Sequence, residues 1–264
     1  MTVRRRIKVR LKWAIRRTVG ALRVWEWVLA LSQAHRVPAI WLFERREIAR
    51  LRRALGPQPR ARVACIVSTY RRPEKLRLAV ESILAQTEPD FRIVVVDDGA
   101  GLPELPADPR LLAVSLSRNT GIPGVVRNVG IGLGASDCIA FLDDDNTWEP
   151  NHLAVGLAEL EAGYDLVYTG LTRRRPDGEV QDTLARPFDR RTLARRSYVD
   201  TSSILVRRTP KVRFSRLPRS HLSRGGEDRE LVYRLSHNAR VTLVPVVTVN
   251  YLVHPGNVFN IWKD

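Results

Sequence analysis

Short runs of apolar and β-branched residues alternate with helical patterns from residue 61 onward, and this alternation constrains the fold more than any other feature of the sequence. The runs read RVACIVST at 62–69, FRIVVV at 91–96, LLAVSL at 111–116 and CIAFL at 138–142. Helical patterns occupy 73–86 and 124–133 between them, and a further helix and strand are expected at 227–235 and 241–253. Continuously apolar strands that alternate with helices are typical of parallel sheets with both faces covered. The sequence therefore predicts a Rossmann-like α/β fold with a mostly parallel central sheet and helices on both faces.

Acidic residues follow two of these runs directly. Asp97 and Asp98 end the second run, and Asp143, Asp144 and Asp145 end the fourth. Ligands of such sheets bind at the carboxyl ends of the strands, where gathered carboxylates repel one another unless a cation compensates. Alternation along the strand places Asp143 and Asp145 on the same side and Asp144 on the opposite side, so that a D-x-D pair can face one ion. Oxygen ligands suit Mg²⁺ or Mn²⁺, which commonly keep substrate phosphates in their coordination shell, so we expect a divalent ion that holds a diphosphate.

The positive charge of the chain is concentrated at its start. Lys and Arg total 44 against 28 acids, and residues 1–60 hold 16 of the basic but only 3 of the acidic residues. Apolar residues recur there with helical spacing, which predicts a basic amphipathic helical extension over 1–57, broken near Pro38, ahead of a domain at 58–264. The most apolar stretch, 24–31, contains Glu26 and is shorter than the roughly 20 residues that span a bilayer.

Three interpretations of this extension remain open: binding to an anionic membrane surface, packing against the domain or a second copy of the chain, and a nucleic-acid arm. Nucleic acid is disfavoured because the rest of the chain shows no basic stripe or stacking motif to continue such a site. Two cysteines without C-x-x-C spacing indicate a reducing compartment. We therefore expect a cytoplasmic protein, peripheral at the inner face of the cell membrane if the extension binds lipid.

Five motifs in order carry a resemblance to a known family. They are VSTYRRP at 67–73, VVVDDGA at 94–100, NTGIPGVVRNVGI at 119–131, FLDDDNTW at 141–148 and GGEDRELVYRL at 225–235. Together they resemble the family 2 glycosyltransferases, inverting enzymes of the GT-A fold that use nucleotide-diphosphate sugars, over about residues 61–257. The resemblance implies metal-assisted transfer of a sugar from a UDP or dTDP donor to a hydroxyl-bearing acceptor. It also implies a nucleotide-sugar half at about 61–148 and an acceptor half at about 149–264.

The resemblance assigns donor-binding roles to eight residues. Thr69 and Tyr70 match a loop that contacts the nucleobase and its ribose, and Asp98 matches an acid that accepts a hydrogen bond from the base. Arg71 stands where Asn is common in the family, so its role is open. For Arg127, contact with phosphate and a structural ion pair are both open. The implied nucleotide-sugar set is Thr69, Tyr70, Arg71, Asp98, Asn119, Arg127, Asp143 and Asp144.

The resemblance also implies the metal site and the catalytic base. Asp143 and Asp145 match the D-x-D pair of the family, with Asp145 as the direct ligand of Mg²⁺ or Mn²⁺, and His254 matches a late histidine that reaches the metal or the diphosphate. Asp228 matches the base that takes a proton from the acceptor hydroxyl. The acceptor-side set is Glu227, Asp200, Thr201 and Ser202, of which the last three either bind an acceptor or complete a strand edge.

Two other functions compete with this interpretation. A catalytically silent GT-A domain would act as a membrane or assembly adaptor through its basic helices, but the presence of Asp143, Asp145 and Asp228 argues against it. A nucleotidyltransferase would usually carry a glycine-rich, basic phosphate loop after its first strand, and VSTYRRP has no glycine. The sequence therefore favours an active glycosyltransferase.

Overall fold

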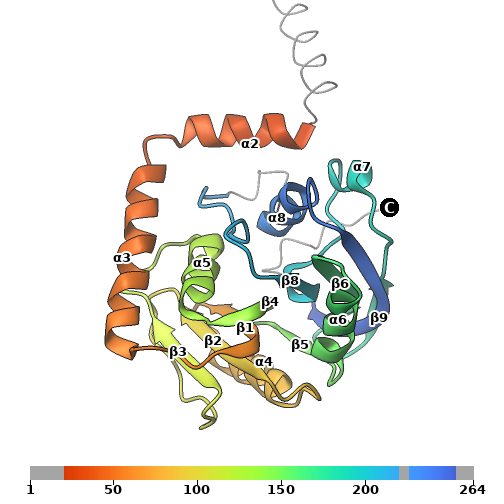
Figure 1. The fold of residues 1–264 in the computed structure, drawn as a ribbon, viewed down its shortest axis with the longest axis horizontal. Coiled ribbons are helices and arrows are strands. Elements are labelled where there is room, and N and C mark those ends of the chain that lie inside the picture. The colour runs from red at the N-terminus through yellow and green to blue at the C-terminus, as the bar shows by residue number, and fades with distance from the viewer. Residues whose placement is uncertain (1–20, 220–225, 254–264) are drawn as a thin grey trace, which may run out of the picture.

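The computed structural model describes residues 21–219 and 226–253 of the protein, and a nine-stranded sheet forms the centre of this described part (Figure 1). Its first half is parallel and has the order β3-β2-β1-β4. These strands are β1 (Ala61–Thr69), β2 (Phe91–Asp97), β3 (Leu111–Ser115) and β4 (Ser136–Asp143). All four lie where the apolar runs predicted them.

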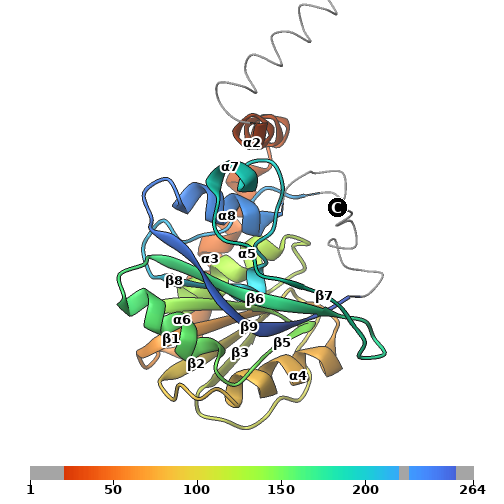
Figure 2. The ribbon, with the colours of Figure 1, turned by 90° about the vertical axis from the view of Figure 1, so that its right-hand side faces the viewer.

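The second half of the sheet is mixed. β8 (Ile204–Arg207) lies antiparallel between β4 and β6 (Leu166–Arg174), and β9 (Val241–Leu252) runs parallel to β6. β5 (Asn146–Trp148) pairs with β9 and β7 (Val180–Leu184) with β6, both antiparallel. β5 follows β4 after only two residues, yet it is the last strand in the order β3-β2-β1-β4-β8-β6-β9-β5. The sheet therefore curls, so that its last strand returns to the turn that joins β4 to β5 (Figure 2).

Helices cover both faces of the sheet, as the sequence predicted. α4 (Pro73–Leu84) and α6 (His152–Glu161) pack on one face, and α5 (Pro123–Leu133) and α8 (Glu227–Leu235) pack on the other. Neighbouring residues of one strand contribute to different cores: Ile66 of β1 packs with α5, and Val67 packs with α4. The short helices α7 (Arg190–Leu193) and η1 (Thr201–Ser203) complete the described part between β7 and β8.

Local sequence explains where α4 and α5, the helices on the two sides of β1, begin, and how closely α5 packs on the strand. Both helices have proline in the first turn, where the missing N–H costs no helical hydrogen bond. In α5, a Cβ on Gly130 would lie 2.6 Å from Cγ2 of Ile66, a separation that real side chains do not adopt. Gly130 therefore allows this helix to lie against β1.

Two helices precede the sheet, α2 (Ala21–Ser32) and α3 (Val37–Leu55), with Pro38 in the first turn of the second (Figure 1). α3 packs against α5 and buries Leu51, Glu44 and Glu47. The extension thus contacts the domain, one of the interactions that the sequence left open. Residues 1–20 lie outside the described residues, and no described helix is both long and apolar enough to cross a bilayer.

Polar contacts fix the two helices to the segment that approaches α8. Glu44 accepts hydrogen bonds from Nε of Arg216 at 2.9 Å and from Nδ2 of Asn128 at 3.0 Å. Glu26 of α2 accepts a hydrogen bond from Nη1 of Arg219 at 2.8 Å. Gln33, directly after α2, donates through Nε2 to the carbonyl of Pro218 at 2.8 Å. The stretch 214–219, which we call the arm, is therefore held between the N-terminal helices and the rest of the protein.

Replacing Glu44 by Ala should lower the free energy of unfolding by about 2–3 kcal/mol, because it leaves the guanidinium of Arg216 and the amide of Asn128 without their common partner. Urea unfolding measures this loss. The control is Glu81→Ala, since the pair of Glu81 with Arg77 is exposed and such pairs contribute at most about 0.5 kcal/mol. Equal losses in the two variants would show that Glu44 does not anchor the arm.

Candidate active site

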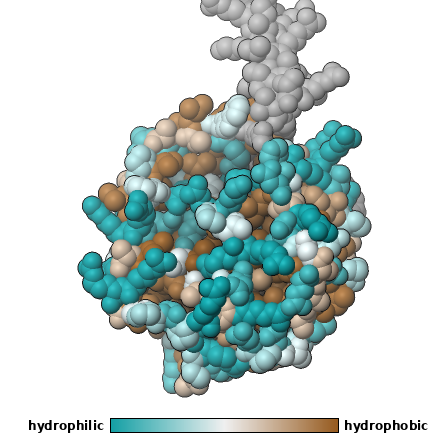
Figure 3. Space-filling view, viewed as in Figure 1, coloured by the Kyte–Doolittle hydropathy of each residue, from teal (hydrophilic) through white to brown (hydrophobic). Residues whose placement is uncertain are grey.

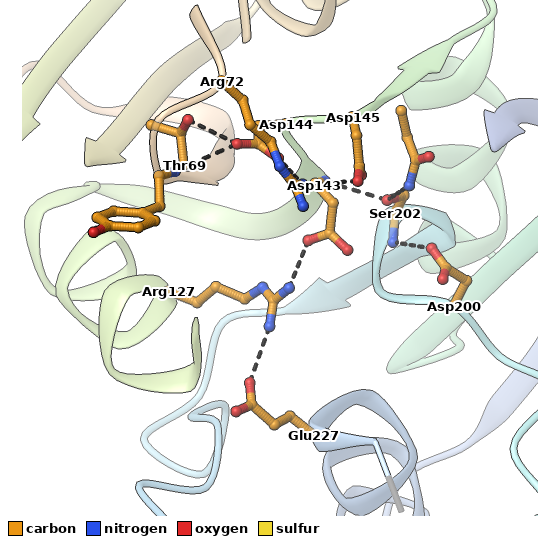
Figure 4. A network of polar contacts seen from close by, with 11 residues as sticks. Thr69, Arg72, Arg127, Asp143, Asp144, Asp145, Asp200, Ser202 and Glu227 are labelled. Carbon is orange, nitrogen blue, oxygen red and sulfur yellow. Dashed lines mark hydrogen bonds and ion pairs between the residues drawn. The ribbon is translucent and has the colours of Figure 1, made fainter. Parts of the chain in front are cut away.

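The turn that joins β4 to β5 lies at the centre of a polar network (Figure 4). β4 ends at Asp143, and Asp144 and Asp145 form the turn. Strand alternation therefore gives no reason to place Asp143 and Asp145 on one side with Asp144 opposite, because the strand ends at Asp143, and the joint contact of the pair with a metal ion stays a prediction. Asp144 and Asp145 instead contact one arginine, and Asp143 contacts another.

Arg72 is the arginine shared by Asp144 and Asp145. Its Nη1 donates to both carboxylates at 2.8 Å, and Asp144 also accepts from the hydroxyl of Thr69 at 2.7 Å. Burial raises the pKa of Asp144, while Thr69 and Arg72 oppose this rise. The motif resemblance pointed to Arg71 and did not indicate Arg72. The sequence feature that indicates Arg72 is its position directly before Pro73, where the chain turns into α4 at the carboxyl end of β1.

Arg71 has a different environment. It adopts φ 55°, in the left-handed region, and its guanidinium lies 5.1 Å from the ring centroid of the exposed Tyr70. Asn tolerates this backbone conformation better than most residues. The left-handed turn therefore gives a physical reason why an Asn suits this position.

A cavity of about 360 Å³ opens beside Thr69 and Arg72. Its other lining residues are Arg71, Pro73, Asp97, Ala100, Gly101, Leu102 and Pro103. Oδ2 of Asp97 accepts hydrogen bonds from the backbone N–H groups of Ala100 and Gly101 at 2.7 and 2.8 Å, which shapes this wall. The carboxyl ends of β1 and β2 thus form a site of the kind that the α/β topology predicts.

Asp98 and Asn119, both expected near the nucleotide, lie in a separate cluster and do not line this cavity. Asp98 accepts hydrogen bonds from the N–H and hydroxyl of Thr120 at 2.8 Å, from the N–H of Gly121 at 2.9 Å and from Nδ2 of Asn119 at 3.3 Å. Both of its oxygens hold this loop at the start of α5. The acid that reaches the cavity is its neighbour Asp97, which the sequence analysis did not single out from the pair.

Arg127 of α5 joins the turn to α8. Its Nη2 donates to Asp143 at 2.5 Å and its Nη1 donates to Glu227 at 3.0 Å (Figure 4). Arg127 and Glu227 are buried, and the guanidinium lies 5.0 Å from the ring centroid of Phe214 in the arm. Of the two roles left open for Arg127, the structural ion pair is the one present here.

Asp228 follows Glu227 in the first turn of α8 and is also buried. Burial raises its pKa to about 6, although the backbone N–H of Arg229 donates to it at 2.6 Å. Burial likewise raises the pKa of Glu227 to about 7, against the opposing charge of Arg127. Carboxyl groups with raised pKa values in a cleft are typical of acid–base sites.

The acceptor-side residues Asp200, Thr201 and Ser202 are buried, with Asp200 as the N-cap of η1 and the other two within it. Asp200 accepts from the N–H of Ser202 at 2.8 Å, and the hydroxyl of Ser202 accepts from the N–H of Asp143 at 3.2 Å and from Nδ2 of Asn146 at 2.8 Å. Burial, together with the charges of Asp143 and Asp228, raises the pKa of Asp200. Ser202 therefore holds the acidic turn in place, and Asp200 shares the electrostatic environment of Asp228.

The donor atoms at the turn fit a divalent ion only in part. Asp143 and Asp145 offer carboxylate oxygens, the ligand type that Mg²⁺ and Mn²⁺ prefer, and both side chains retain some exposure. Within residues 21–219 and 226–253, no group of three or more His, Cys, Asp or Glu is arranged to hold a metal. His254, the third expected ligand, lies outside the described residues. Two carboxylates suffice where a substrate completes the coordination shell.

Asp228→Asn should make the protein more stable at pH 8 by about 2 kcal/mol and leave its stability unchanged at pH 4. A carboxyl whose pKa is raised to about 6 by folding destabilises the native state as pH rises through that value, whereas a neutral amide does not. Urea unfolding at both pH values measures the difference. Asp108→Asn is the control, since Arg110 lowers the pKa of Asp108 and its removal should give no gain at pH 8. Equal stability of Asp228→Asn and the unaltered protein at pH 8 would contradict the burial cost.

Comparison with known proteins places this geometry in a family. Over 96 residues the chain is 41% identical to the succinoglycan biosynthesis protein ExoO of Rhizobium meliloti (strain 1021), a match that covers 34% of this chain and 27% of ExoO. It is 34% identical over 102 residues to ExoW of the same organism, which covers 35% of this chain and 32% of ExoW. The matches thus span about a third or less of these relatives.

Solved structures show the same fold. The structure of residues 1–349 of S. aureus TarS in complex with UDP-GlcNAc aligns with a TM-score of 0.59 at 18% identity, covering 77% of this chain and 62% of that chain. The complex of the same protein with UDP gives 0.56 at 20% identity, with 74% and 61% covered. The sequence profile described as glycosyl transferase family 2 matches residues 64–216, more than half of the chain, and the protein therefore belongs to the family 2 glycosyltransferases.

Proposed function

We propose that the protein transfers a sugar, with inversion, from a nucleoside-diphosphate sugar to a hydroxyl-bearing acceptor. The observation that carries this proposal is a run of polar contacts that begins at the cavity and ends at α8. Thr69 and Arg72 contact Asp144 at one end of the acidic turn, and Arg127 connects Asp143 to Glu227 at the other (Figure 4). A nucleotide site and a buried carboxylate pair are thereby placed on two sides of one turn.

The cavity between β1 and β2 is the proposed nucleoside site. Asp97, one of its lining residues, is one proposed acceptor for the N3–H of uracil or thymine, although its Oδ2 already accepts hydrogen bonds from the N–H groups of Ala100 and Gly101 and from the hydroxyl of Ser115. Asp98, the acceptor that the sequence resemblance implies, is held in the same way by the Asn119 loop, and it remains the other proposed acceptor. The structures of TarS, solved with UDP and with UDP-GlcNAc, support a uridine nucleotide for this fold.

The acidic turn is the proposed site of the diphosphate. We propose that Asp143 and Asp145 hold Mg²⁺ or Mn²⁺ together with the donor, and that the ion when bound neutralises the diphosphate and so stabilises it as a leaving group. Arg72 lines the cavity and neutralises Asp144 and Asp145. It is therefore placed to keep these carboxylates compatible with an anionic donor.

Asp228 is the proposed general base. Of the two carboxylates that begin α8, Glu227 is held in an ion pair with Arg127, although burial still raises its pKa to about 7. A pKa of about 6 leaves Asp228 ionised at neutral pH yet more basic than an ordinary aspartate. Asp228 takes the proton from the acceptor hydroxyl as its oxygen bonds to the anomeric carbon, and the bond from that carbon to the diphosphate oxygen breaks on the opposite face. Asp200 and Thr201 lie on the acceptor side of this exchange.

The donor proposal predicts that UDP, or dTDP, raises the Tm of the protein more than GDP or CDP does, and that Mn²⁺ increases this shift. Asp145→Asn should remove most of the Mn²⁺-dependent part of this shift in Tm, because the substitution removes one of the two expected carboxylate ligands. Asp177→Asn, in the exposed turn after β6, is the matched control and should behave as the unaltered protein. A shift that is equal for all four nucleotides, or independent of Mn²⁺, would contradict the proposal.

The catalytic proposal predicts that Asp228→Asn retains the UDP-induced shift in Tm but releases UDP from its donor at least about 100-fold more slowly, since general bases typically contribute factors of this size. In the unaltered protein the rate should rise with pH through about 6, where Asp228 loses its proton. Release of UDP from the preferred UDP-sugar, with water as the acceptor, gives the rate. A variant with unchanged rate would show that another group is the base.

A further inference from the structure

The N-terminal helices present two different faces to their surroundings. Leu22 and Glu26 of α2, and Gln33 directly after it, lie on the side that contacts the domain, where Leu22 is buried and the other two bond to the arm. At about 100° per residue, Trp27, Val28 and Leu31 lie on the opposite side of the helix. They are 57%, 52% and 78% exposed, respectively.

The bend into α3 extends this apolar surface. Trp41 and Leu42, in the second turn of α3, are each 40% exposed. We call Trp27, Val28, Leu31, Trp41 and Leu42 the outer face. These five are half of the ten large hydrophobic residues that are exposed in the described part of the chain, although α2 and α3 are a small fraction of it. Figure 3 shows hydrophobic surface gathered over α2 at the upper edge of the molecule.

The charges of the same region are sorted between the two faces. All three acidic residues of the first 60 bond inward: Glu26 with Arg219, Glu44 with Arg216, and Glu47 with the N–H and hydroxyl of Ser117. The exposed arginines near the bend are Arg36, Arg45 and Arg46, and Arg45 lies over the ring of Trp41 at 4.7 Å. The sequence before α2 adds eight Lys and Arg and no acid. The outward side is therefore apolar and cationic, without acidic neighbours from its own helices.

We propose that the outer face docks on an anionic lipid surface. Exposed Trp and Leu beside Arg, on a helix whose other side is bound to protein, match the chemistry of a membrane interface: apolar side chains enter the acyl boundary and arginines meet lipid phosphates. A soluble partner of neutral or basic surface would not match the concentrated positive charge. Packing against the domain and binding to a membrane, which the sequence offered as alternatives, are thus assigned to opposite sides of the same helices. This proposal does not depend on the catalytic one.

Docking through this face would also bring the lipid surface close to the active site. The inner side of α2 holds Arg219, and the charge of Arg219 acts on both Glu227 and Asp228. Phe214 and Arg216 of the arm bond to α5 and α3, respectively, and Arg219 at the end of the arm lies close enough to α8 for its charge to act on the two carboxylates. An acceptor carried by the membrane would then meet the site without leaving the surface.

The test uses the full chain and sedimentation with vesicles, either of phosphatidylcholine alone or of phosphatidylcholine with phosphatidylglycerol. We expect binding to the anionic vesicles only, weakened by salt. The double variant Trp27→Ser and Leu31→Ser should lower the partition coefficient at least about tenfold. The control Leu78→Ser removes an apolar residue that is 51% exposed on α4, at the opposite end of the molecule (Figures 1 and 2), and should bind as the unaltered chain.

Folding of each variant is checked by its Tm and by urea unfolding, and the single variant Leu31→Ser replaces the double variant if that one is unstable. Binding that is equal for both lipid compositions, or unchanged in the outer-face variants, would overturn the proposal. A chain that is dimeric in solution, and that these variants convert to monomers, would also overturn it by assigning the outer face to a second copy.

Discussion

The buried guanidinium of Arg127 is the interaction on which the site depends. It lies between Asp143 at the end of β4 and Glu227 at the start of α8, two elements that are far apart in the sequence. Removing charges from water is costly unless each is paired, and breaking one such pair leaves its partner uncompensated. Burial raises the pKa values of Asp228 and Asp200, and it also raises that of Glu227 although Glu227 is paired with Arg127. A single cation thus fixes the position of the site, and the carboxyl groups around it are more basic than ordinary ones.

The N-terminal helices belong to this arrangement more closely than their composition suggests. Glu44 reaches Asn128, one residue after Arg127 in α5, and also holds Arg216 of the arm. Phe214 of the same arm packs against the Arg127 guanidinium and accepts a hydrogen bond at its carbonyl from Asn128. The basic extension therefore supports the back of the site through its few acids. Of its described arginines, Arg50 and Arg52 also donate to the domain, at the carbonyls of Ser115 and Gly132, whereas Arg36, Arg45 and Arg46 are exposed.

Prediction of the site from sequence succeeded for the elements and failed for the side-chain directions. The placement of Asp143, Asp144, Asp145, Glu227 and Asp228 at strand and helix ends was correct, because apolar periodicity and proline positions mark these ends locally. The alternation argument for Asp143 and Asp145 does not apply, since alternation holds only while the strand continues, and their pairing at a metal stays a prediction. Arg72 was missed because its contact with Asp144 and Asp145 depends on which neighbouring strand lies opposite, and no local pattern encodes that.

The sequence by itself determined the α/β alternation, the parallel half of the sheet, the helices on both faces and the chemistry available at the strand ends. These features follow from interactions between residues that are close in the chain. Only the tertiary structure decided that the sheet curls so that β5 pairs with β9, that Arg127 bridges the acidic turn to α8, and that the N-terminal helices turn their acids inward. Those outcomes depend on burying charged groups against partners from distant segments, and the cost of leaving such a group unpaired becomes effective only when the chain is folded.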